Sequence, residues 1–552
     1  MMVKPRGLVI LGLSFIPGLV LGSSNTAALP ATSAASQLAT ATQPINMGED
    51  FNAFAKSIGL SSSQTCKLKA KYDAIVNGGN SPEDNLDLAC QVAQESLGAD
   101  QVDSAPVGQA LINENWSLTC VADAYCVVLP RNTDETVKAV RVISYFKVKF
   151  AVRAGGHSPN PGWSSVGQEG ILLDLQRLNQ ISLSSDKKLC SLGPGARWGN
   201  VVATLGTQNA TVLAGRNPLV GVGGLILGGG YHHTSSEYGT VADNVKNFEV
   251  VLSNGTVVNA NIDENNDLFW ALKGGGPNFG IVTRFDVYTL PGTEIWYQLA
   301  IYGLDQAFDI LDTFAKWQQN EGSSDFKANL ILSLGIDSHV IGLVYSAPAP
   351  EVPSAFAPFF ELTPLQVVVP ATNGTFASLN EAIAPFVPME QMRHDYGGVS
   401  SRVDAQLYKD VYTFWAERAL AARDATGANQ TFVLQHVPSN MVAQGIAKGG
   451  NPLGLIQETH QWWTTLVDWR EAKDDDAARA VTIDTVAQWK KLGQERGLYL
   501  PFYFMNDSGR NQNPIAGYGQ ANVDKLNEVS RKYDSSQFFQ TQQVGGFLLS
   551  RA

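Results

Sequence analysis

Two adjacent glycines directly before a histidine constrain this chain more than any other stretch of it. They lie in Arg153-Ala154-Gly155-Gly156-His157-Ser158, which follows an apolar, strand-like run over 148–152 and precedes a Pro/Gly/Ser loop over 159–167. Adjacent glycines permit positive φ and close backbone approach, so consecutive N–H groups can converge on an anion such as a pyrophosphate. Taken alone, the hexamer has a second interpretation, which is a plain Gly-Gly-His turn without a ligand.

Two further glycine clusters, at 221–230 and 273–283, favour a ligand. Three such loops, separated by strand-like runs such as 248–252, indicate one long ligand that passes several turns. Their spacing does not match a dinucleotide fingerprint, which opens a helix inside a short βαβ unit. Gly223 and Gly228 have the spacing of a Walker loop, but Gly229-Gly230 stands where Lys and Ser/Thr are required. A nucleoside-triphosphate site is therefore excluded.

Several motifs, in the right order, resemble FAD-linked oxidases, and most closely the fungal form of the berberine-bridge-enzyme-like branch of the vanillyl-alcohol-oxidase superfamily. The matching stretches are 153–158, 223–230, 267–276, 278–283, 518–519, 532–534, 538–539 and 545–547. The resemblance is strong over 116–292 and over about the last fifty residues, and weak between them. It implies an α+β fold, with a PCMH-type FAD-binding domain of two subdomains and a substrate domain whose antiparallel sheet is covered by helices.

The resemblance implies FAD as cofactor and a set of residues that hold it. These are Arg153, Ala154, Gly155, Gly156, His157, Ser158, Gly221, Gly224, Leu225, Gly228, Gly229, Tyr238, Gly239, Asp243, Val245, Gly280, Ile281 and Tyr518. His157 occupies the position that carries a covalent 8α-histidyl link in the family; the alternative is a noncovalent flavin beside it. Many relatives with two links have a Cys in a G-x-C-P-x-V-G stretch. Asn217 stands there in 215–221, so a single covalent link is predicted.

The segment 503–507 resembles a strand of the family that places a Tyr or Asn over the flavin, so Tyr503 and Asn506 are the predicted catalytic residues. Residues three apart do not share a face of an ideal strand, so either a bulge lies between them or only one is in the site. In that case we expect Tyr503, because a phenol can relay a proton. Asp507 is expected to point away.

Other aromatic and imidazole side chains have two interpretations each. His232 and His233, after Tyr231, are either surface or sheet-edge histidines or part of the site. His460, with Trp462 and Trp463, either lines the substrate pocket or belongs to a core aromatic stripe.

The chain divides into six segments along its length. We expect a cleaved signal peptide at 1–22, a flexible linker at 23–45, an N-terminal segment at 46–115, the FAD-binding domain at 116–292, the substrate domain at 293–499, and a C-terminal return to the FAD domain at 500–552. A membrane anchor is the alternative for the leader, but its apolar stretch is shorter than the roughly 20 residues a span needs.

Hydrophobic periodicity supports this division. Strand-like runs at 147–152 and 171–175 flank a helical pattern that begins at 134, which indicates an α/β arrangement. After residue 294 the elements become longer. A succession of longer strands and helices is expected at 308–319, 326–335, 339–345, 404–421, 431–436, 453–469 and 477–493.

Charge and cysteine content limit the partners. The formal net charge of −12, which becomes −14 if the leader with Lys4 and Arg6 is removed, argues against nucleic acid and anionic membranes. No cysteine pair has metal-ligand spacing, so no metal is expected. For a secreted chain we expect disulfides Cys66–Cys90 and Cys120–Cys126, with Cys190 left free. Asparagines that begin glycosylation sequons are Asn115, Asn209, Asn254, Asn373, Asn429 and Asn506, of which we place Asn506 in the pocket instead.

The sequence therefore predicts a secreted FAD-dependent oxidase with O₂ as electron acceptor. Its substrate is expected to be a small organic molecule with an oxidisable bond, such as a secondary metabolite. Two alternatives stay open: a dehydrogenase with another acceptor, and a non-redox, flavin-carrying cyclase or scaffold.

Overall fold

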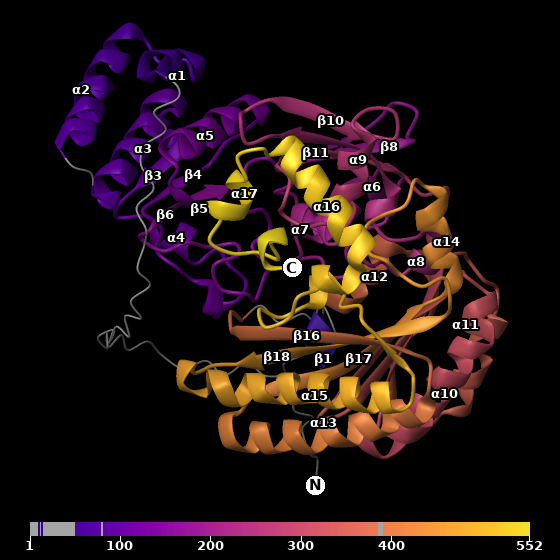
Figure 1. Ribbon diagram of the computed structural model, residues 1–552. Helices are drawn as coiled ribbons and strands as arrows, with labels where there is room; N and C mark the ends of the chain where they lie inside the picture. Colours follow the sequence, from indigo (N-terminus) through magenta and orange to yellow (C-terminus); the bar gives the residue numbers. More distant parts are fainter. Residues whose placement is uncertain (1–8, 11–12, 15–49, 79–80, 385–389) are drawn as a thin grey trace, which may run out of the picture.

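The computed structural model describes residues 9–10, 13–14, 50–78, 81–384 and 390–552 (Figure 1). Apart from the short paired strands β1 (Val9–Ile10) and β2 (Leu13–Ser14), the predicted signal peptide and linker lie outside the described residues. The rest forms three sheets with helices packed on them. This mixed architecture confirms the α+β fold class that the motifs implied.

The first sheet has four strands in the order β3 (Val102–Ser104), β4 (Cys126–Val128), β6 (Gly170–Asp174) and β5 (Lys149–Arg153). Strands β4 and β5 both run parallel to β6, because α5 (Thr133–Phe146) crosses over between them. Asn132 caps α5 by accepting from the N–H of Glu135. The edge strand β5 ends at Arg153, the first residue of the glycine-histidine hexamer, so the hexamer lies at the end of this edge strand.

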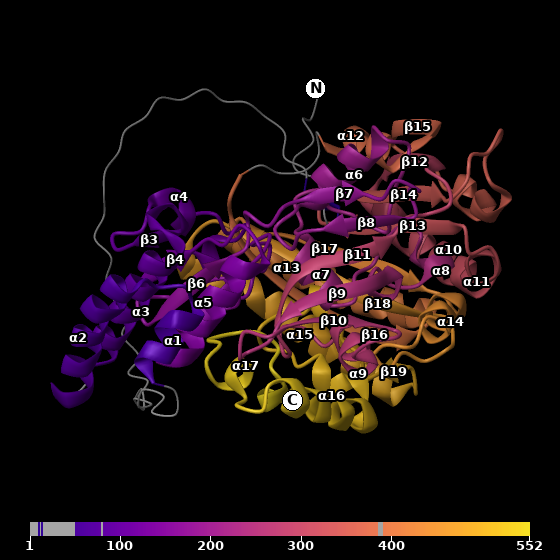
Figure 2. The same cartoon turned by 90° about the horizontal axis from the view of Figure 1, so that it is seen from above.

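Three N-terminal helices pack beside this sheet, at the end of the molecule far from α10, α11 and α14 (Figure 2). They are α1 (Phe51–Ser57), α2 (Ser62–Gly78) and α3 (Pro82–Leu97). Phe54 of α1 stacks on Tyr145 of α5, with ring centroids 3.9 Å apart. The shared apolar core makes the helices part of the flavin-binding half.

The second sheet is antiparallel and has five strands in spatial order. They are β10 (Val257–Asn261), β9 (Val245–Val251), β11 (Ile281–Tyr288), β8 (Leu189–Leu192) and β7 (Ile181–Leu183). Helices α6 (Trp198–Gly206), α7 (Val222–Leu227), α8 (Ser235–Tyr238) and α9 (Asn266–Leu272) lie in the connections. The second and third glycine clusters fall in these connections, so both end near the same sheet.

The third sheet is antiparallel and has eight strands in spatial order. They are β15 (Gln366–Thr375), β12 (Glu294–Tyr302), β14 (His339–Tyr345), β13 (Ala328–Gly335), β17 (Asn429–Val437), β18 (His460–Trp469), β16 (Arg393–Arg402) and β19 (Tyr499–Leu500). Helices α10 (Ala307–Gln319), α13 (Ala405–Thr426) and α15 (Asp475–Glu495) share one core with it (Figure 1). Helix α11 (Glu321–Ser324), α12 (Phe376–Ile383) and α14 (Ser439–Ala447) complete this part.

Both faces of the eight-stranded sheet are buried, and alternation of side chains decides which core each residue joins. In β18, Trp463 belongs to the core under the helices, whereas Trp462 belongs to the core shared with the flavin-binding half. In β13, Leu332 belongs to the core under the helices and Ile331 to the core shared with the flavin-binding half. The face that carries Trp462 therefore forms one wall between the two halves.

After β19 the chain returns to the flavin-binding half through α16 (Gln520–Tyr533) and α17 (Phe538–Thr541), drawn in yellow in Figure 1. The Tyr533 hydroxyl donates to Asp267 at 2.8 Å, and Lys532 pairs with the same carboxylate at 2.6 Å. Further on, the Phe150 N–H donates to the Gln542 carbonyl at 3.1 Å. The C-terminal segment thus fastens both the 267–276 region and β5.

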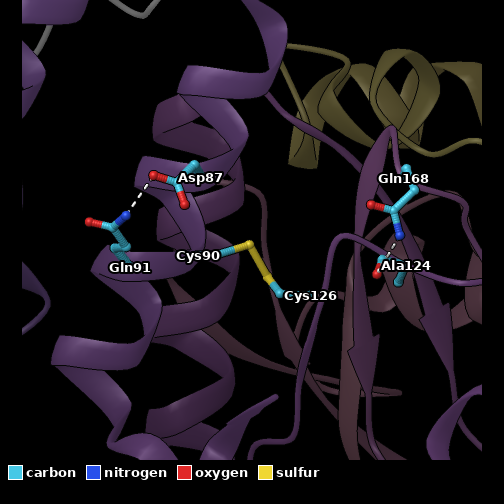
Figure 3. Close-up of a disulfide and its surroundings, with 6 residues drawn as sticks. All are labelled: Asp87, Cys90, Gln91, Ala124, Cys126 and Gln168. Atoms are coloured by element: carbon cyan, nitrogen blue, oxygen red, sulfur yellow. Dashed lines mark hydrogen bonds between the residues drawn. A yellow bond between two sulfur atoms is a disulfide. The ribbon is translucent and has the colours of Figure 1, made fainter. Parts of the chain in front are cut away.

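The structure corrects the predicted disulfides. Cys90 of α3 is bonded to Cys126 of β4 (Figure 3). Cys66 is exposed and Cys120 and Cys190 are buried, all three as free thiols. The pairing follows packing rather than proximity in sequence, because α3 and β4 share one core. Cys66 faces outward on α2, and the Cys120 thiol donates to the Ser158 carbonyl at 3.1 Å.

Among the described residues, no helix is both long and apolar enough to cross a membrane. A search of the same residues finds no group of three or more His, Cys, Asp or Glu side chains that could hold a metal ion.

Candidate active site

A cavity of about 320 Å³ lies where the three glycine-rich loops meet the eight-stranded sheet. The sheet contributes Tyr396, and the C-terminal segment contributes 504–508. Twelve of the predicted catalytic and cofactor-binding residues line it. They are Ala154, Gly155, Gly156, His157, Ser158, Gly221, Gly224, Leu225, Gly228, Gly280, Ile281 and Asn506. Segments far apart in the sequence thus contribute to one chamber.

The other predicted cofactor residues lie behind the cavity wall, where they hold the loops in place. Arg153 forms a fully buried ion pair with Asp174 at 2.5 Å, which fixes β5 to β6 just before the hexamer. Asp243 accepts from the Thr240 N–H at 2.9 Å, and the Tyr518 hydroxyl donates to the Gly274 carbonyl at 2.8 Å. The remaining four, none of which lines the cavity, are Gly229, Tyr238, Gly239 and Val245.

Two of the glycine loops touch through their backbones at Gly155 and Gly221. A Cβ on either glycine would overlap main-chain atoms of the other, so neither position admits a side chain. Arg197 joins the same loops, because its Nη1 donates to the carbonyls of Gly155 and Leu219, each at 2.7 Å. Gly156 has φ of +63°, a conformation that favours glycine. The result is a narrow, backbone-lined cradle beside His157.

His157 is held neutral with one ring nitrogen free. Burial, with contributions from His394 and Arg197, lowers the pKa of His157 to about 3. Its Nε2 is buried and has no hydrogen-bond partner among the described residues. Its ring stacks on Trp116, with centroids 4.1 Å apart. The neutral imidazole of His157 thus lines the cavity beside the glycine cradle.

Trp116 and His394 are members of the site that the sequence did not reveal. Trp116 lies between two imidazoles, since its other face stacks on His394 at 3.6 Å between centroids. Asp468 of the neighbouring strand holds Nδ1 of His394 at 2.8 Å. A tryptophan in a loop and a histidine in a strand carry no local motif, so no sequence signal pointed to either.

The predicted strand over 503–507 was wrong. Residues Met505–Asp507 form a turn of 3₁₀ helix, and Tyr503 lies on the opposite side of the chain from Phe504, packed against the core under the helices. The Tyr503 hydroxyl is 3.2 Å from that of Tyr499, and Tyr503 does not line the cavity. The side chains of Phe502 and Phe504 face the core shared with the flavin-binding half, whereas that of Tyr503 faces the opposite side and lies outside the cavity. The preference for Tyr503 over Asn506 was therefore also wrong.

Asn506 acts as a clamp on the second glycine loop. Its Oδ1 accepts from the Gly230 N–H at 3.0 Å, and its Nδ2 donates to the Gly224 carbonyl at 3.2 Å. A Cβ at Gly228 would overlap this amide. With both ends of the amide engaged, Asn506 holds the loop and has no proton to exchange.

Asp507 points into the cavity, contrary to the expectation that it would point away, because the 3₁₀ turn rotates it inward. Its Oδ2 accepts from Nε2 of Gln435 at 2.8 Å, and Oε1 of Gln435 accepts from Arg216. Burial raises the pKa of the Asp507 carboxyl, while the charge of Arg216 opposes that change. A carboxyl, an amide and a guanidinium thus form one chain along the wall.

An aromatic layer lies under this polar chain. Phe504 lines the cavity and stacks on Trp462 with ring centroids 4.5 Å apart, and Tyr231 packs edge-on against Trp462 at 5.8 Å. The Tyr231 hydroxyl donates to the His436 carbonyl at 2.6 Å. Trp462 itself does not line the cavity and belongs to the core, as do Trp463 and the buried His460.

His232 and His233 are neither surface nor sheet-edge residues, so that interpretation was wrong. Only 2% and 5% of their surfaces are exposed, and both pack against Phe376. Burial lowers the pKa of His232 to about 3 and the pKa of His233 well below its ordinary value. Neither lines the cavity.

The cavity fits an FAD cofactor on the features of this chain. The Gly155–Gly221 contact leaves a cradle without side chains, which suits a pyrophosphate held by backbone N–H groups. The imidazole of His157 lines the cavity next to that cradle. The cavity extends from there to the polar wall of Arg216 and Asp507, so a long cofactor can share it with a small substrate.

Comparison with known proteins agrees with this geometry. A family model described as an FAD binding domain matches residues 124–261. A FAD-dependent monooxygenase of Arthrobotrys oligospora is 35% identical over 471 residues, which are 85% of this chain and 90% of that protein. The bifunctional solanapyrone synthase of Alternaria solani is 30% identical over 480 residues, 86% of this chain and 92% of that protein.

A solved structure shares the fold. It is the glucooligosaccharide oxidase of Acremonium strictum, described with a 6-S-cysteinyl, 8α-N1-histidyl FAD. It superposes with a TM-score of 0.69 at 17% identity and covers 83% of this chain and 99% of that chain.

Proposed function

Because the chain belongs to the family of fungal FAD-dependent oxidoreductases that includes these relatives, we propose that it is an oxidase that passes electrons from a small organic substrate to O₂. The bound flavin supplies the hydride-accepting chemistry, and the protein supplies binding, orientation and proton handling. The observation that carries the proposal is that the neutral imidazole of His157 lines the cavity beside the glycine cradle. The similarity to solanapyrone synthase favours a secondary metabolite as substrate.

His157 carries the cofactor through a single covalent link in this proposal. A neutral imidazole can attack a carbon electrophile, and its low pKa keeps it neutral across the physiological range. Asn217 lines the cavity where many relatives with two links have a cysteine, and none of the cavity-lining residues is a cysteine. The backbone of 154–158 and 221–228 and the start of β11 hold the rest of the cofactor.

Asp507 accepts the proton that the substrate releases. Five described residues of the lining have ionisable side chains, and they are His157, Arg216, Tyr231, Tyr396 and Asp507. Of these only Asp507 is a carboxyl, and burial raises its pKa toward the range in which a general base works well. The hydrogen bond from Gln435 fixes the carboxyl in one orientation.

Secretion is part of the same proposal. It is supported by the signal-like leader, the glycosylation sequons and the Cys90–Cys126 disulfide, since disulfides persist in oxidising compartments. Expression in a secreting fungal host and N-terminal sequencing of the protein in the medium test it; retention of the leader on a cell-bound protein would contradict it.

Two experiments test the enzyme proposal without a known substrate. Acid precipitation should leave yellow flavin with wild-type protein and release it from His157→Ala. Chemically reduced holoenzyme, mixed with air-saturated buffer, should regain its oxidised flavin spectrum within seconds and form peroxide. Slow reoxidation by O₂ but rapid reoxidation by a dye would indicate a dehydrogenase, and a colourless protein would exclude both.

A further inference from the structure

Arg216 is a cation without a counterion, facing the cavity. It is the only Lys or Arg among the described residues that line the cavity. Its single hydrogen bond in the described part of the chain goes to the neutral Oε1 of Gln435, and Asp507, whose charge acts on it, forms no ion pair with it. A buried charge is costly unless it is paired, so the site is incomplete without an acceptor from outside the protein.

Asp507, the carboxyl that lines the same cavity, does not bind Arg216 directly. Gln435 separates Arg216 from Asp507, because its amide oxygen faces the guanidinium and its amide nitrogen faces the carboxyl. The charges of Arg216 and Asp507 act on each other across that amide, but the two groups are not in contact. The guanidinium makes no hydrogen bond to any described carboxylate, so it keeps N–H donors for a ligand.

The position of Arg216 favours the substrate over the cofactor as the missing partner. Its guanidinium lies 4.8 Å from the centre of the Tyr231 ring, and Tyr231 is bonded to Asn329 of β13 and to His436 of β17. Gln435 also belongs to β17. Arg216 is thus fixed against residues of the eight-stranded sheet, which carries none of the predicted cofactor loops.

The neighbours of Arg216 also indicate the shape of the ligand. Tyr231, Tyr396 and Phe504 line the cavity around it, so a flat group can lie against aromatic rings while the guanidinium binds its edge. Guanidinium groups bind carboxylate and other delocalised oxygen anions through paired N–H donors.

We propose that Arg216 determines substrate specificity by binding an anionic oxygen, either a carboxylate or a phenolate or enolate, on a planar part of the substrate. This proposal rests on the proposed function, since it names the substrate class of the same cavity. It adds a requirement that the oxidase chemistry does not impose, namely that the substrate carries an acidic oxygen beside the bond that is oxidised.

Calorimetry on flavin-loaded protein tests the proposal with three probes: benzoate, 4-nitrophenolate at a pH where it is ionised, and neutral benzamide. Wild type should bind at least one anion more tightly than benzamide. Arg216→Gln should weaken that anion about tenfold to a hundredfold, as loss of a charged hydrogen bond does, and leave benzamide unchanged. Arg216→Lys should recover part of the loss. Preference for benzoate would identify a carboxylate, and preference for nitrophenolate a phenolate or enolate.

Arg402→Gln is the matched control, because Arg402 lies on the surface in an ion pair with Glu458 and does not line the cavity. Three results would overturn the proposal: equal anion binding by wild type and Arg216→Gln, no anion binding by wild type, or loss of flavin from Arg216→Gln, which would assign Arg216 to the cofactor. Failure of the oxidase proposal would appear separately, as slow reoxidation of wild type by O₂.

Discussion

Trp116 lies flat against His157, with ring centroids 4.1 Å apart and ring planes inclined by 11°. The same indole stacks on His394 with an inclination of 4°, so three rings form one pile behind the cavity. Trp116 is itself fixed by its backbone N–H, which donates to the Gly156 carbonyl at 2.8 Å. The pile leaves His157 little freedom to rotate and keeps water from one face of its ring.

Trp116→Ala should therefore lower the fraction of flavin that is covalently bound. An aromatic contact of this kind contributes about 0.5–1.5 kcal/mol, which corresponds to a roughly twofold to tenfold slower attachment when it is lost. In-gel flavin fluorescence after denaturation measures the covalent fraction. Trp116→Phe keeps a ring against His157 and should retain most of it. Full covalent loading of Trp116→Ala would show that the stacking does not position His157.

Proteolysis of wild-type protein should give one flavin-bearing peptide, and that peptide should contain His157. Asn217 lines the cavity, and its Oδ1 accepts from the Leu219 N–H at 2.9 Å, which fixes the turn that holds it. Asn217→Cys should introduce a second flavin link, seen as a cross-linked pair of peptides by mass spectrometry. Asn217→Ser is the control for the loss of the amide. A cysteinyl-flavin peptide from wild type would refute the single link.

The sequence predicted those parts of the site that are made of backbone. Gly155, Gly221 and Gly228 belong to contiguous motifs. Each of these positions requires glycine, because a side chain there would overlap a neighbouring segment. The helices and strands followed from periodicity in the same way, and β14 lies at the predicted residues. Features set by local chemistry could thus be read from the chain.

Side chains that reach the site from distant segments could not be predicted from the sequence. Arg216, Gln435 and Asp507 meet across more than two hundred residues, and each looks like an ordinary polar residue in its own stretch. Tyr503 was wrongly predicted to be in the site. It lies one residue before Phe504, which lines the cavity, and its side chain points to the opposite side, toward Tyr499. The Cys90–Cys126 pair likewise depends on how α3 packs against β4, which cysteine spacing does not encode.

Loss of the Cys90–Cys126 disulfide should destabilise the N-terminal part of the protein. The bridge spans a sequence separation of 36 residues, and the chain-entropy treatment gives about 4 kcal/mol for a loop of this size. Cys90→Ser with Cys126→Ser should therefore lower the thermal midpoint by several degrees in a melt followed by circular dichroism. Cys66→Ser, which changes an exposed free thiol, should leave the midpoint unaltered. An unchanged midpoint in the double variant would mean that packing of α3 suffices.

The Asp507 carboxyl should make stability fall as the pH rises. Burial raises its pKa in the folded protein, whereas the unfolded chain loses this proton at the ordinary value of about 4. Between those two values the unfolded state binds fewer protons than the folded state, so the free energy of unfolding decreases with pH through that window and stays lower above it.

Asp507→Asn removes this ionisation and keeps an oxygen for the Gln435 amide. The variant should match wild type below pH 4 and exceed its stability at pH 7, because only wild type must ionise a buried carboxyl in that range. Denaturant titrations of the holoprotein between pH 3.5 and 8 measure the difference. Asp484→Asn, on the exposed face of α15, controls for the loss of a negative charge. If Asp507→Asn is no more stable than wild type at pH 7, the carboxyl is compensated in the folded protein, and its assignment as a base with a raised pKa must be abandoned.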